Sequence, residues 1–190
     1  MATTPVRPGA LRRAAEEIER STELRVEIIG GALLMSPPRR GKHAGTVRRL
    51  RERIGSRLAG GLGVYESASV GPPDAEDDYA TPDLLALPVE WENNDAWLAE
   101  PRRTALAVEV VPTLSPVSHL ATKTSWYAVA GVPTLLALDP RNGSWTLYTH
   151  PRDGAYQGIL HGKYGEPVPL PAPLPAELDT SGLPLYAPRS

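Results

Sequence analysis

Cysteine is absent from this sequence of 190 residues. Its absence excludes structural disulfides, zinc sites built from thiolates, and cysteine nucleophiles. A surplus of positive charge is also lacking, because 20 basic residues stand against 22 acidic residues and the net charge is −2. No overall basic field therefore attracts nucleic acid, and binding to it would depend on a local basic strip.

Long hydrophobic runs and the common cofactor motifs are missing as well. No stretch approaches the length of a membrane span, and the N-terminus lacks the apolar core of a signal peptide. The glycines at positions 60, 61 and 63 are not followed by a lysine and serine pair, so they do not indicate a phosphate-binding loop. We therefore expect a cytoplasmic protein with no membrane segment and no organic cofactor.

The chain divides into three parts. Residues 1–10 are expected to be a loose lead-in, residues 11–166 a single domain, and residues 167–190 a proline-rich C-terminal arm. Hydrophobic periodicity predicts helices over residues 11–18, 42–58 and 117–130. The strand pattern predicts a hairpin over 24–35 and strands over 64–70, 82–88, 104–111, 132–138, 144–149 and 156–160. This order favours an α+β domain built on a mixed, mostly antiparallel central sheet.

A glutamate within an apolar strand is the strongest chemical signal. Glu109 lies in the valine-rich residues 104–111, which are typical of a strand buried on both faces. A lone carboxylate there is costly unless it is paired, hydrogen-bonded or bound to a metal. Asp83 begins another apolar run, and Lys123 lies on the apolar side of a predicted helix. Two acids on core strands and one inward lysine are the components of a metal-dependent phosphodiesterase centre.

Each of these three residues also has a purely structural interpretation. Glu109 would be an acid paired with a buried arginine, and Asp83 would be a solvated residue at the start of a strand. Lys123 would pack its stem against the core while its amine reaches water. Together the three residues explain one another, because two carboxylates need a cation and a partly buried ammonium needs carboxylates or phosphate nearby.

Several short motifs follow one another over residues 11–165. They are Glu27-Ile28-Ile29-Gly30-Gly31-Ala32-Leu33, Met35-Ser36-Pro37-Pro38 with His43, Pro82-Asp83, Val108-Glu109-Val110-Val111 with Ser115-Pro116, Lys123, Tyr127, Gly131-Val132 and Leu138-Asp139-Pro140. In this order and spacing they resemble the Uma family of bacterial endonucleases, which belongs to the restriction-endonuclease-like, PD-(D/E)-x-K superfamily. The resemblance implies a restriction-endonuclease-like fold, a central mixed sheet flanked by helices, with the acids at the strand ends.

The resemblance also implies roles for individual residues. Asp83 matches the aspartate after proline, and Glu109 matches the acid of the E-x-K element. Val111 stands where superfamily members often place lysine, and Lys123 in the following helix takes that place. One departure bears on how Lys123 is held, because His119 stands one turn before it where the family usually has an acid.

The implied chemistry is a hypothesis that rests on hard-cation coordination. Asp83, Glu109 and the backbone carbonyl of Val110 would supply oxygen ligands to Mg²⁺ (or Mn²⁺), which activates a water for attack on phosphorus. The catalytic residues would then be Asp83, Glu109 and Lys123. In this hypothesis Lys123 orients the attacking water and offsets the charge that builds on the phosphorane.

Further contacts are predicted from the neighbouring segments. Glu27 is a candidate accessory carboxylate and His43 a candidate for phosphate contact or proton transfer, although a structural role suits both equally well. DNA is the expected substrate, and a homodimer is expected because cleavage of a duplex needs two active sites. The one concentration of basic residues gives candidate contacts to the DNA backbone, with a solvated helix face as the alternative: Arg39, Arg40, Lys42, Arg48 and Arg49.

Three classes of function stay open on the sequence alone. The first is a Mg²⁺-dependent endonuclease that cuts DNA. The second is a nuclease fold that has lost cleavage and binds nucleic acid or protein, which His119 would support. The third is another metal-dependent phosphoester hydrolase. The position of Lys123 relative to the two acids separates the first from the second, and a narrow pocket in place of a wide groove would favour the third.

Overall fold

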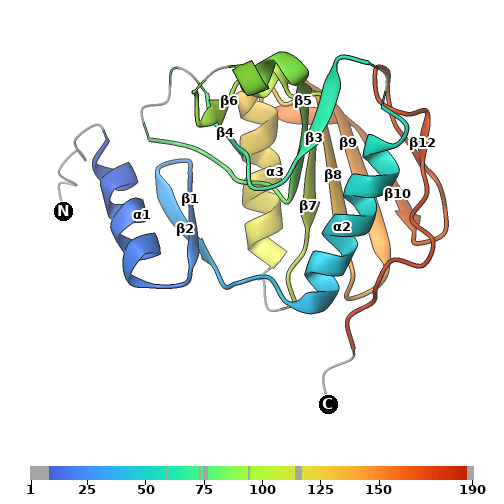
Figure 1. Ribbon diagram of the computed structural model, residues 1–190, viewed down its shortest axis with the longest axis horizontal. Coiled ribbons are helices and arrows are strands. Elements are labelled where there is room, and N and C mark those ends of the chain that lie inside the picture. Colours follow the sequence, from blue (N-terminus) through green and yellow to red (C-terminus); the bar gives the residue numbers. More distant parts are fainter. Residues whose placement is uncertain are drawn as a thin grey trace.

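A six-stranded mixed sheet runs through the middle of the molecule (Figure 1). The computed structural model describes residues 9–58, 60–72, 74, 77–93, 95–113 and 117–187. Only the neighbours β7 and β8 are parallel, and the other pairs of this sheet are antiparallel. The order across the sheet is β10 (Ala155–Lys163), β9 (Ser144–Arg152), β8 (Thr134–Asp139), β7 (Leu106–Val110), β5 (Leu84–Pro88) and β3 (Leu62–Tyr65).

The alternation of side chains along the strands produces two separate cores. On one face, Leu84, Val108 and Leu136 pack against α2 (Gly41–Gly55) through residues such as Leu50. On the other face, Leu85, Ala107 and Leu135 pack against α3 (Val117–Ala130). Successive residues along each strand point to opposite faces of the sheet. Because apolar side chains occupy both faces, the strands are buried on both sides. The fold is therefore a restriction-endonuclease-like α+β sheet between helices, as predicted.

The parallel pair β7 and β8 requires a crossover, and α3 provides it. A parallel connection cannot be made by a tight turn, so the chain leaves the end of β7, crosses one face of the sheet as a helix and returns. The helix ends at Ala130, and Gly131 follows with a φ of 83°, a left-handed conformation that suits glycine at this position. This crossover places α3 directly over the face to which Glu109 points.

A hairpin and an N-terminal helix form a smaller unit beside the sheet, at the left of Figure 1. Strands β1 (Arg25–Ile29) and β2 (Ala32–Ser36) are joined by Gly30 and Gly31, whose φ angles are 59° and 73°. Positive φ at both central residues is what a tight two-residue turn of this kind requires. Helix α1 (Ala10–Ser21) covers β1 through Ala15, which packs with Val26 and Ile28.

The hairpin is fastened to the segment that leads into β5. Ile28 exchanges backbone hydrogen bonds of 3.0 and 2.9 Å with Tyr79. The carboxylate of Asp78 accepts the amide protons of Gly30 and Gly31 at 2.8 and 2.9 Å. These contacts hold the hairpin against the main sheet, and they therefore fix where the inner face of β1 lies.

The C-terminal segment packs on the α2 face of the sheet. It contains the short antiparallel pair β11 (Val168–Pro169) and β12 (Glu177–Leu178), with turns and extended chain around it. Its apolar side chains belong to the same core as Leu50 of α2: Val168, Leu170, Leu174, Leu178 and Leu183. The boundary expected at residue 167 stays a prediction, but the segment is a packed part of the molecule.

The remaining elements are short. They are β4 (Ser69–Val70) paired in parallel with β6 (Leu98–Ala99), and two 3₁₀ turns, Val89–Asn93 and Pro101–Arg103. The strand predicted over 64–70 is wrong in detail, because Ser67 has a φ of 59° and divides it into β3 and β4.

The lead-in predicted over residues 1–10 lies outside the described residues apart from Gly9 and Ala10, at the start of α1. None of the helices in the described part of the chain has the length and apolar composition needed to cross a membrane.

Candidate active site at the end of β5 and β7

The two predicted acids meet because β5 and β7 run in opposite directions. Asp83 immediately precedes β5, and its backbone amide donates to the carbonyl of Val108 at 2.9 Å. Glu109 lies one residue further along β7, near the end of that strand. The amide of Val110 in turn donates to Oδ2 of Asp83 at 2.7 Å. The register of the sheet therefore brings the start of one strand to the end of the other, and both carboxyl groups with them.

Lys123 reaches the same place from the helical layer. Its side chain is only 5 % exposed, and its ammonium contacts Oε1 of Glu109 and lies 2.9 Å from Oε1 of Glu27. One turn later on the same face of α3, the hydroxyl of Tyr127 donates to Oε1 of Glu109 at 2.6 Å. A buried ammonium held between two carboxylates is not a solvated lysine, so the snorkelling interpretation of Lys123 is wrong.

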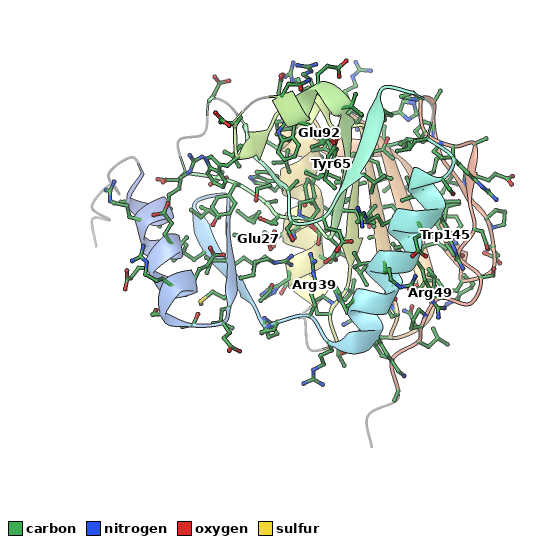
Figure 2. All side chains as sticks on the ribbon, viewed as in Figure 1. Glu27, Arg39, Arg49, Tyr65, Glu92 and Trp145 are labelled. Carbon is green, nitrogen blue, oxygen red and sulfur yellow. The ribbon has the colours of Figure 1, made fainter. Side chains whose placement is uncertain are left out.

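Glu27 enters the site from the hairpin. It is 1 % exposed, on the inner face of β1, and Figure 2 shows it near the middle of the molecule. Besides the ammonium of Lys123, its Oε1 accepts the backbone amide proton of Thr81 at 2.7 Å. Thr81 belongs to the segment that bridges the hairpin to β5, and the contacts that fasten the hairpin therefore also position this third acid.

Two basic side chains contact Asp83 from α2 and the residues just before it. Nε2 of His43 lies 2.9 Å from Oδ1 of Asp83, and Nη2 of Arg39 lies 2.8 Å from the same oxygen as an ion pair without directed hydrogen-bond geometry. His43 is on the first turn of α2, and its Nδ1 lies 3.3 Å from the hydroxyl of Tyr186 in the C-terminal segment. Asp83 is thus held by a histidine, an arginine and a backbone amide.

The pKa values of Asp83 and Glu109 shift in opposite directions. Burial alone would raise the pKa of Asp83, but the hydrogen bond and charge of His43 and the charges of Arg39 and Arg25 outweigh it and lower that pKa to about 2. For Glu109 burial dominates, and the nearby charge of Glu27 adds to it, so its pKa is raised in spite of Lys123. Asp83 is therefore a permanent anion at neutral pH, whereas Glu109 accepts a proton more readily than an ordinary glutamate.

Lys123 and Tyr127 respond to the same surplus of carboxylates. Burial would lower the pKa of Lys123, but the charges of Glu109 and Glu27 raise it above its usual value. Burial and then the charge of Glu109 raise the pKa of Tyr127 well above its usual value. Both groups therefore keep their protons at neutral pH, and both act as hydrogen-bond donors to Glu109.

A small cavity of about 30 Å³ opens beside these groups. It is lined by Glu27, Glu109, Val110 and Lys123, together with Arg25, Val111 and His119. This volume suffices for a water molecule or an ion of similar size. A larger cavity of about 870 Å³ lies on the outer face of α3 beside Trp126, and none of the predicted catalytic residues lines it. The larger cavity is therefore not the one that contains the candidate catalytic residues.

The oxygen donors of the site suit a hard divalent cation. Within the described residues no group of three or more histidine, aspartate or glutamate side chains is arranged to hold an ion unaided. Mg²⁺ does not require one, because it keeps several waters and binds through one or two carboxylates. A carboxylate oxygen accepts about two hydrogen bonds. Oδ2 of Asp83 has one partner, and Oε2 of Glu109 has none among the described residues, so both retain acceptor capacity.

The predicted basic contacts fall into two groups. Arg39 lies in the site beside Asp83, and Arg40 lines a neighbouring cavity. Lys42 donates to the carbonyl of Leu185 at 2.8 Å. Arg49, labelled in Figure 2, donates to the carbonyl of Gly182 in the C-terminal segment. Arg48 is exposed and pairs with Glu52 of the same helix. Contact with DNA stays a prediction for all five.

Some residues of the site were missed by the sequence interpretation. Arg25 lies two positions before Glu27, and the two-residue period of a strand would have placed it on the same face. Thr81 contributes only a backbone amide, which no side-chain motif reveals. Tyr186 is 143 residues from His43 in the chain, and nothing local indicates their contact. Val111 is a buried apolar residue directly after β7, and Lys123 of α3 is the lysine that reaches the acids.

Comparison with known proteins gives a family and a similar fold. The family model for Uma2, described as putative restriction endonuclease, matches residues 13–185. The fold is similar to that of a putative nuclease belonging to DUF820 from Anabaena variabilis ATCC 29413, with a TM-score of 0.65 and 17% identity over 80% of this chain and 84% of that one. A DrdV–DNA complex matches at 12% identity over 62% of this chain and 10% of the other chain, but its TM-score of 0.37 is too low to show a shared fold. No protein of curated function matches the sequence.

Proposed function

Because the chain belongs to the Uma2 family, described as putative restriction endonuclease, we propose that it is a nuclease that hydrolyses phosphodiester bonds in DNA with the help of Mg²⁺ or Mn²⁺. One observation carries this proposal. Asp83, Glu109 and Lys123 come from three different elements and converge at one end of the sheet, where each is buried. Burying three ionisable groups is unfavourable for folding, and functional sites are where such arrangements are retained.

Each residue has a distinct role in the proposed reaction. Asp83, Glu109 and the carbonyl of Val110 would hold the metal, which would supply Lewis-acid chemistry by polarising a phosphoryl oxygen and lowering the pKa of a bound water. Lys123 keeps its proton, so it orients the attacking water and offsets negative charge in the transition state. The raised pKa of Glu109 favours proton uptake in the absence of a metal, so binding of a metal to this carboxylate would compete with its protonation.

Metal binding is the first measurement. Calorimetry with Mn²⁺ and Mg²⁺ compares the unchanged protein with Glu109→Gln, which keeps the size of the side chain and removes its charge. We expect saturable binding that the substitution abolishes. Glu90→Gln is the matched control, because Glu90 is exposed and follows β5 at the end opposite Asp83. Equal binding by all three proteins would show that the acids hold no metal.

Nuclease activity is the second measurement. Supercoiled plasmid and single-stranded DNA are incubated with Mg²⁺, with Mn²⁺ and with EDTA. Cleavage is expected with metal only, and it should be lost in Asp83→Asn, Glu109→Gln and Lys123→Met but kept in Glu90→Gln. Because a duplex has two strands to cut, we propose that a homodimer cleaves it. Light scattering of the protein mixed with duplex DNA measures the number of protein chains in the complex.

A second candidate function is binding without cleavage. The contacts that already surround the acids support it, since Lys123, His43 and Arg39 occupy oxygens that a metal would otherwise approach. DNA binding that is unaffected by metal, together with no cleavage of any substrate, would favour this module over the nuclease.

A further inference from the structure

A second cavity adjoins the site on the side of Asp83 that faces His43. It has a volume of about 90 Å³, and its polar lining residues are Arg25, Ser36, Arg39, Arg40, His43, Thr113 and Tyr186. No carboxylate is among its lining residues in the described part of the chain. The volume accommodates several water molecules, and therefore one tetrahedral oxyanion, but not a nucleobase.

Arg25 and Arg40 are the two residues of this cavity whose charges lack a direct partner in the described part of the chain, and Arg25 is the more buried of the two. It is half-buried, and its guanidinium forms no hydrogen bond or ion pair with any residue that the structure describes. By contrast, Arg39 and His43 both contact Asp83. Guanidinium groups in partly buried positions normally find acceptors, and a planar fork of donors suits the oxygens of a phosphate. Arg25 therefore points to a ligand that supplies the acceptors.

The sum of the charges around the two cavities also favours an anion. The four cationic side chains at the two adjoining cavities are Arg25, Arg39, Arg40 and Lys123, and the three acids are Glu27, Asp83 and Glu109. One positive charge is in excess even when His43 is neutral. A single phosphodiester group carries the one negative charge that would neutralise it.

The start of α2 adds donors at the same place. Arg40 is the N-cap residue, and no side chain caps the helix. The first helical hydrogen bond to this cap runs from the amide of Ala44 to the carbonyl of Arg40. The amides of the preceding first turn have no acceptor within the helix, and their positive end favours an anion.

The two cavities share one wall. Arg25, Ser36 and Pro112 line both the cavity of Glu109 and Lys123 and the cavity of Arg39 and His43. A phosphate in the second cavity would therefore lie next to the reacting phosphate in the first. We propose that the cavity of Arg25, Arg39, Arg40 and His43 binds one phosphate group of the substrate strand, adjacent to the phosphate that is cleaved. This inference rests on the proposed nuclease function and adds its substrate-positioning site.

The test uses the metal-free protein, so that binding is separated from cleavage. Inorganic phosphate is titrated at constant pH in EDTA, and the ring signals of the histidines are followed by NMR. We expect the His43 signal to shift saturably, whereas the signals of His150 and His161, exposed on β9 and β10, stay in place. Absence of a saturable shift at His43 would overturn the proposal.

Substitution identifies the residue responsible. Arg25→Gln should weaken phosphate binding by about tenfold or more, the loss expected when a charged donor is removed. Arg25→Lys keeps the charge and should recover part of the affinity. Arg152→Gln is the charge-matched control at the exposed end of β9 and should bind like the unchanged protein. If Arg25→Gln fails to fold, Arg39→Gln replaces it, and unchanged affinity in whichever folded variant is tested would refute the proposed site.

Two further comparisons distinguish an internal phosphodiester from a strand-end phosphate, and distinguish this anion site from the proposed nuclease function. Dimethyl phosphate represents an internal diester, and inorganic phosphate represents a strand end. Binding of the diester supports an internal phosphate, and binding of inorganic phosphate alone supports a site for a strand end. Phosphate binding without any cleavage would remove the nuclease function but leave the cavity as an anion site. Cleavage with no response at His43 would retain the nuclease and refute this cavity.

Discussion

Nζ of Lys123 lies 2.9 Å from Oε1 of Glu27, although the two residues are 96 positions apart and belong to a helix and a hairpin. The same ammonium also contacts Glu109 of the central sheet. Lys123 is therefore the point at which the three structural units of the site are joined, and its removal should affect folding as well as chemistry.

Lys123→Met should lower the free energy of unfolding by about 3–5 kcal/mol, because it leaves two buried carboxylates without their cation. Urea unfolding measures this loss. Lys163→Met, on the exposed edge strand β10, should be close to neutral. Combining Lys123→Met with Glu109→Gln should cost less than the sum of the two single losses, since the second substitution removes one of the unpaired charges. Additive losses would mean that the buried pair is not coupled.

Asp83 should make the stability of the fold depend on pH in a defined direction. Its pKa is about 2 in the folded protein and near 3.8 in the unfolded chain, so the folded state favours the anion. Its stabilising contribution, about 2 kcal/mol, is present in full above pH 3.8 and is lost as the pH falls through 2. The difference in unfolding free energy between the unchanged protein and Asp83→Asn should shrink over this range.

Tyr127→Phe tests the hydrogen bond that steadies Glu109. The hydroxyl donates to Oε1 at 2.6 Å inside the core, and its removal should cost about 1–3 kcal/mol of stability, as for other hydrogen bonds to charged groups. Metal affinity should fall as well, because Glu109 loses a group that fixes its orientation. Tyr148→Phe is the matched control on β9. A variant with unchanged stability and unchanged metal affinity would show that the hydroxyl has no positioning role.

The basic residues of α2 should differ in their contribution to DNA binding. Arg40 lines the anion cavity, whereas Arg49 already donates to the carbonyl of Gly182. Arg40→Gln should reduce the slope of log affinity against log salt by about 0.9, the value of one phosphate contact. Arg49→Gln should reduce the slope less, and Arg152→Gln should leave it unchanged. An equal effect of Arg49→Gln would mean that this arginine leaves the C-terminal segment when DNA binds.

The C-terminal segment should loosen when its contacts to α2 are removed. Arg53 donates to the carbonyls of Asp179 and Ser181, both at 2.8 Å. Arg53→Met together with Arg49→Met should raise amide hydrogen exchange over residues 179–187 while strands β7 and β8 stay protected. Equal exchange in the double variant and the unchanged protein would show that the buried leucines alone hold this segment.

Local patterns predicted the α+β arrangement of helices and strands and pointed to Glu109 and Lys123 of the candidate site. The helix predicted over 117–130 has those bounds in the structure, because its periodicity and its flanking proline and glycine act within one segment. Glu109 was identifiable because a carboxylate in a valine-rich strand conflicts with burial. Lys123 was identifiable because it stands on the apolar side of that helix.

Other features depend on contacts between distant segments and could not be read locally. The ion pair of Arg39 with Asp83 and the contact of Tyr186 with His43 are set by the packing of α2 on the sheet. The C-terminal arm is a clearer case. Its prolines predicted irregular chain, which is largely what it is, but its spaced leucines enter the core beside Leu50. Burial of irregular chain leaves no periodic signal in the sequence.

The delivery of the lysine by α3 instead of β7 has a mechanical consequence. Asp83 and Glu109 are held by hydrogen bonds within one sheet, and such a ladder permits little relative displacement. Helix α3, which carries Lys123, is positioned on the sheet by side-chain packing between two layers, through residues such as Tyr127 and Leu135. Packed layers can slide by fractions of an ångström at small cost, as in shear motions. Substitutions at this apolar interface, far from any ionisable group, should therefore change the distance between ammonium and carboxylates and tune the site without touching it.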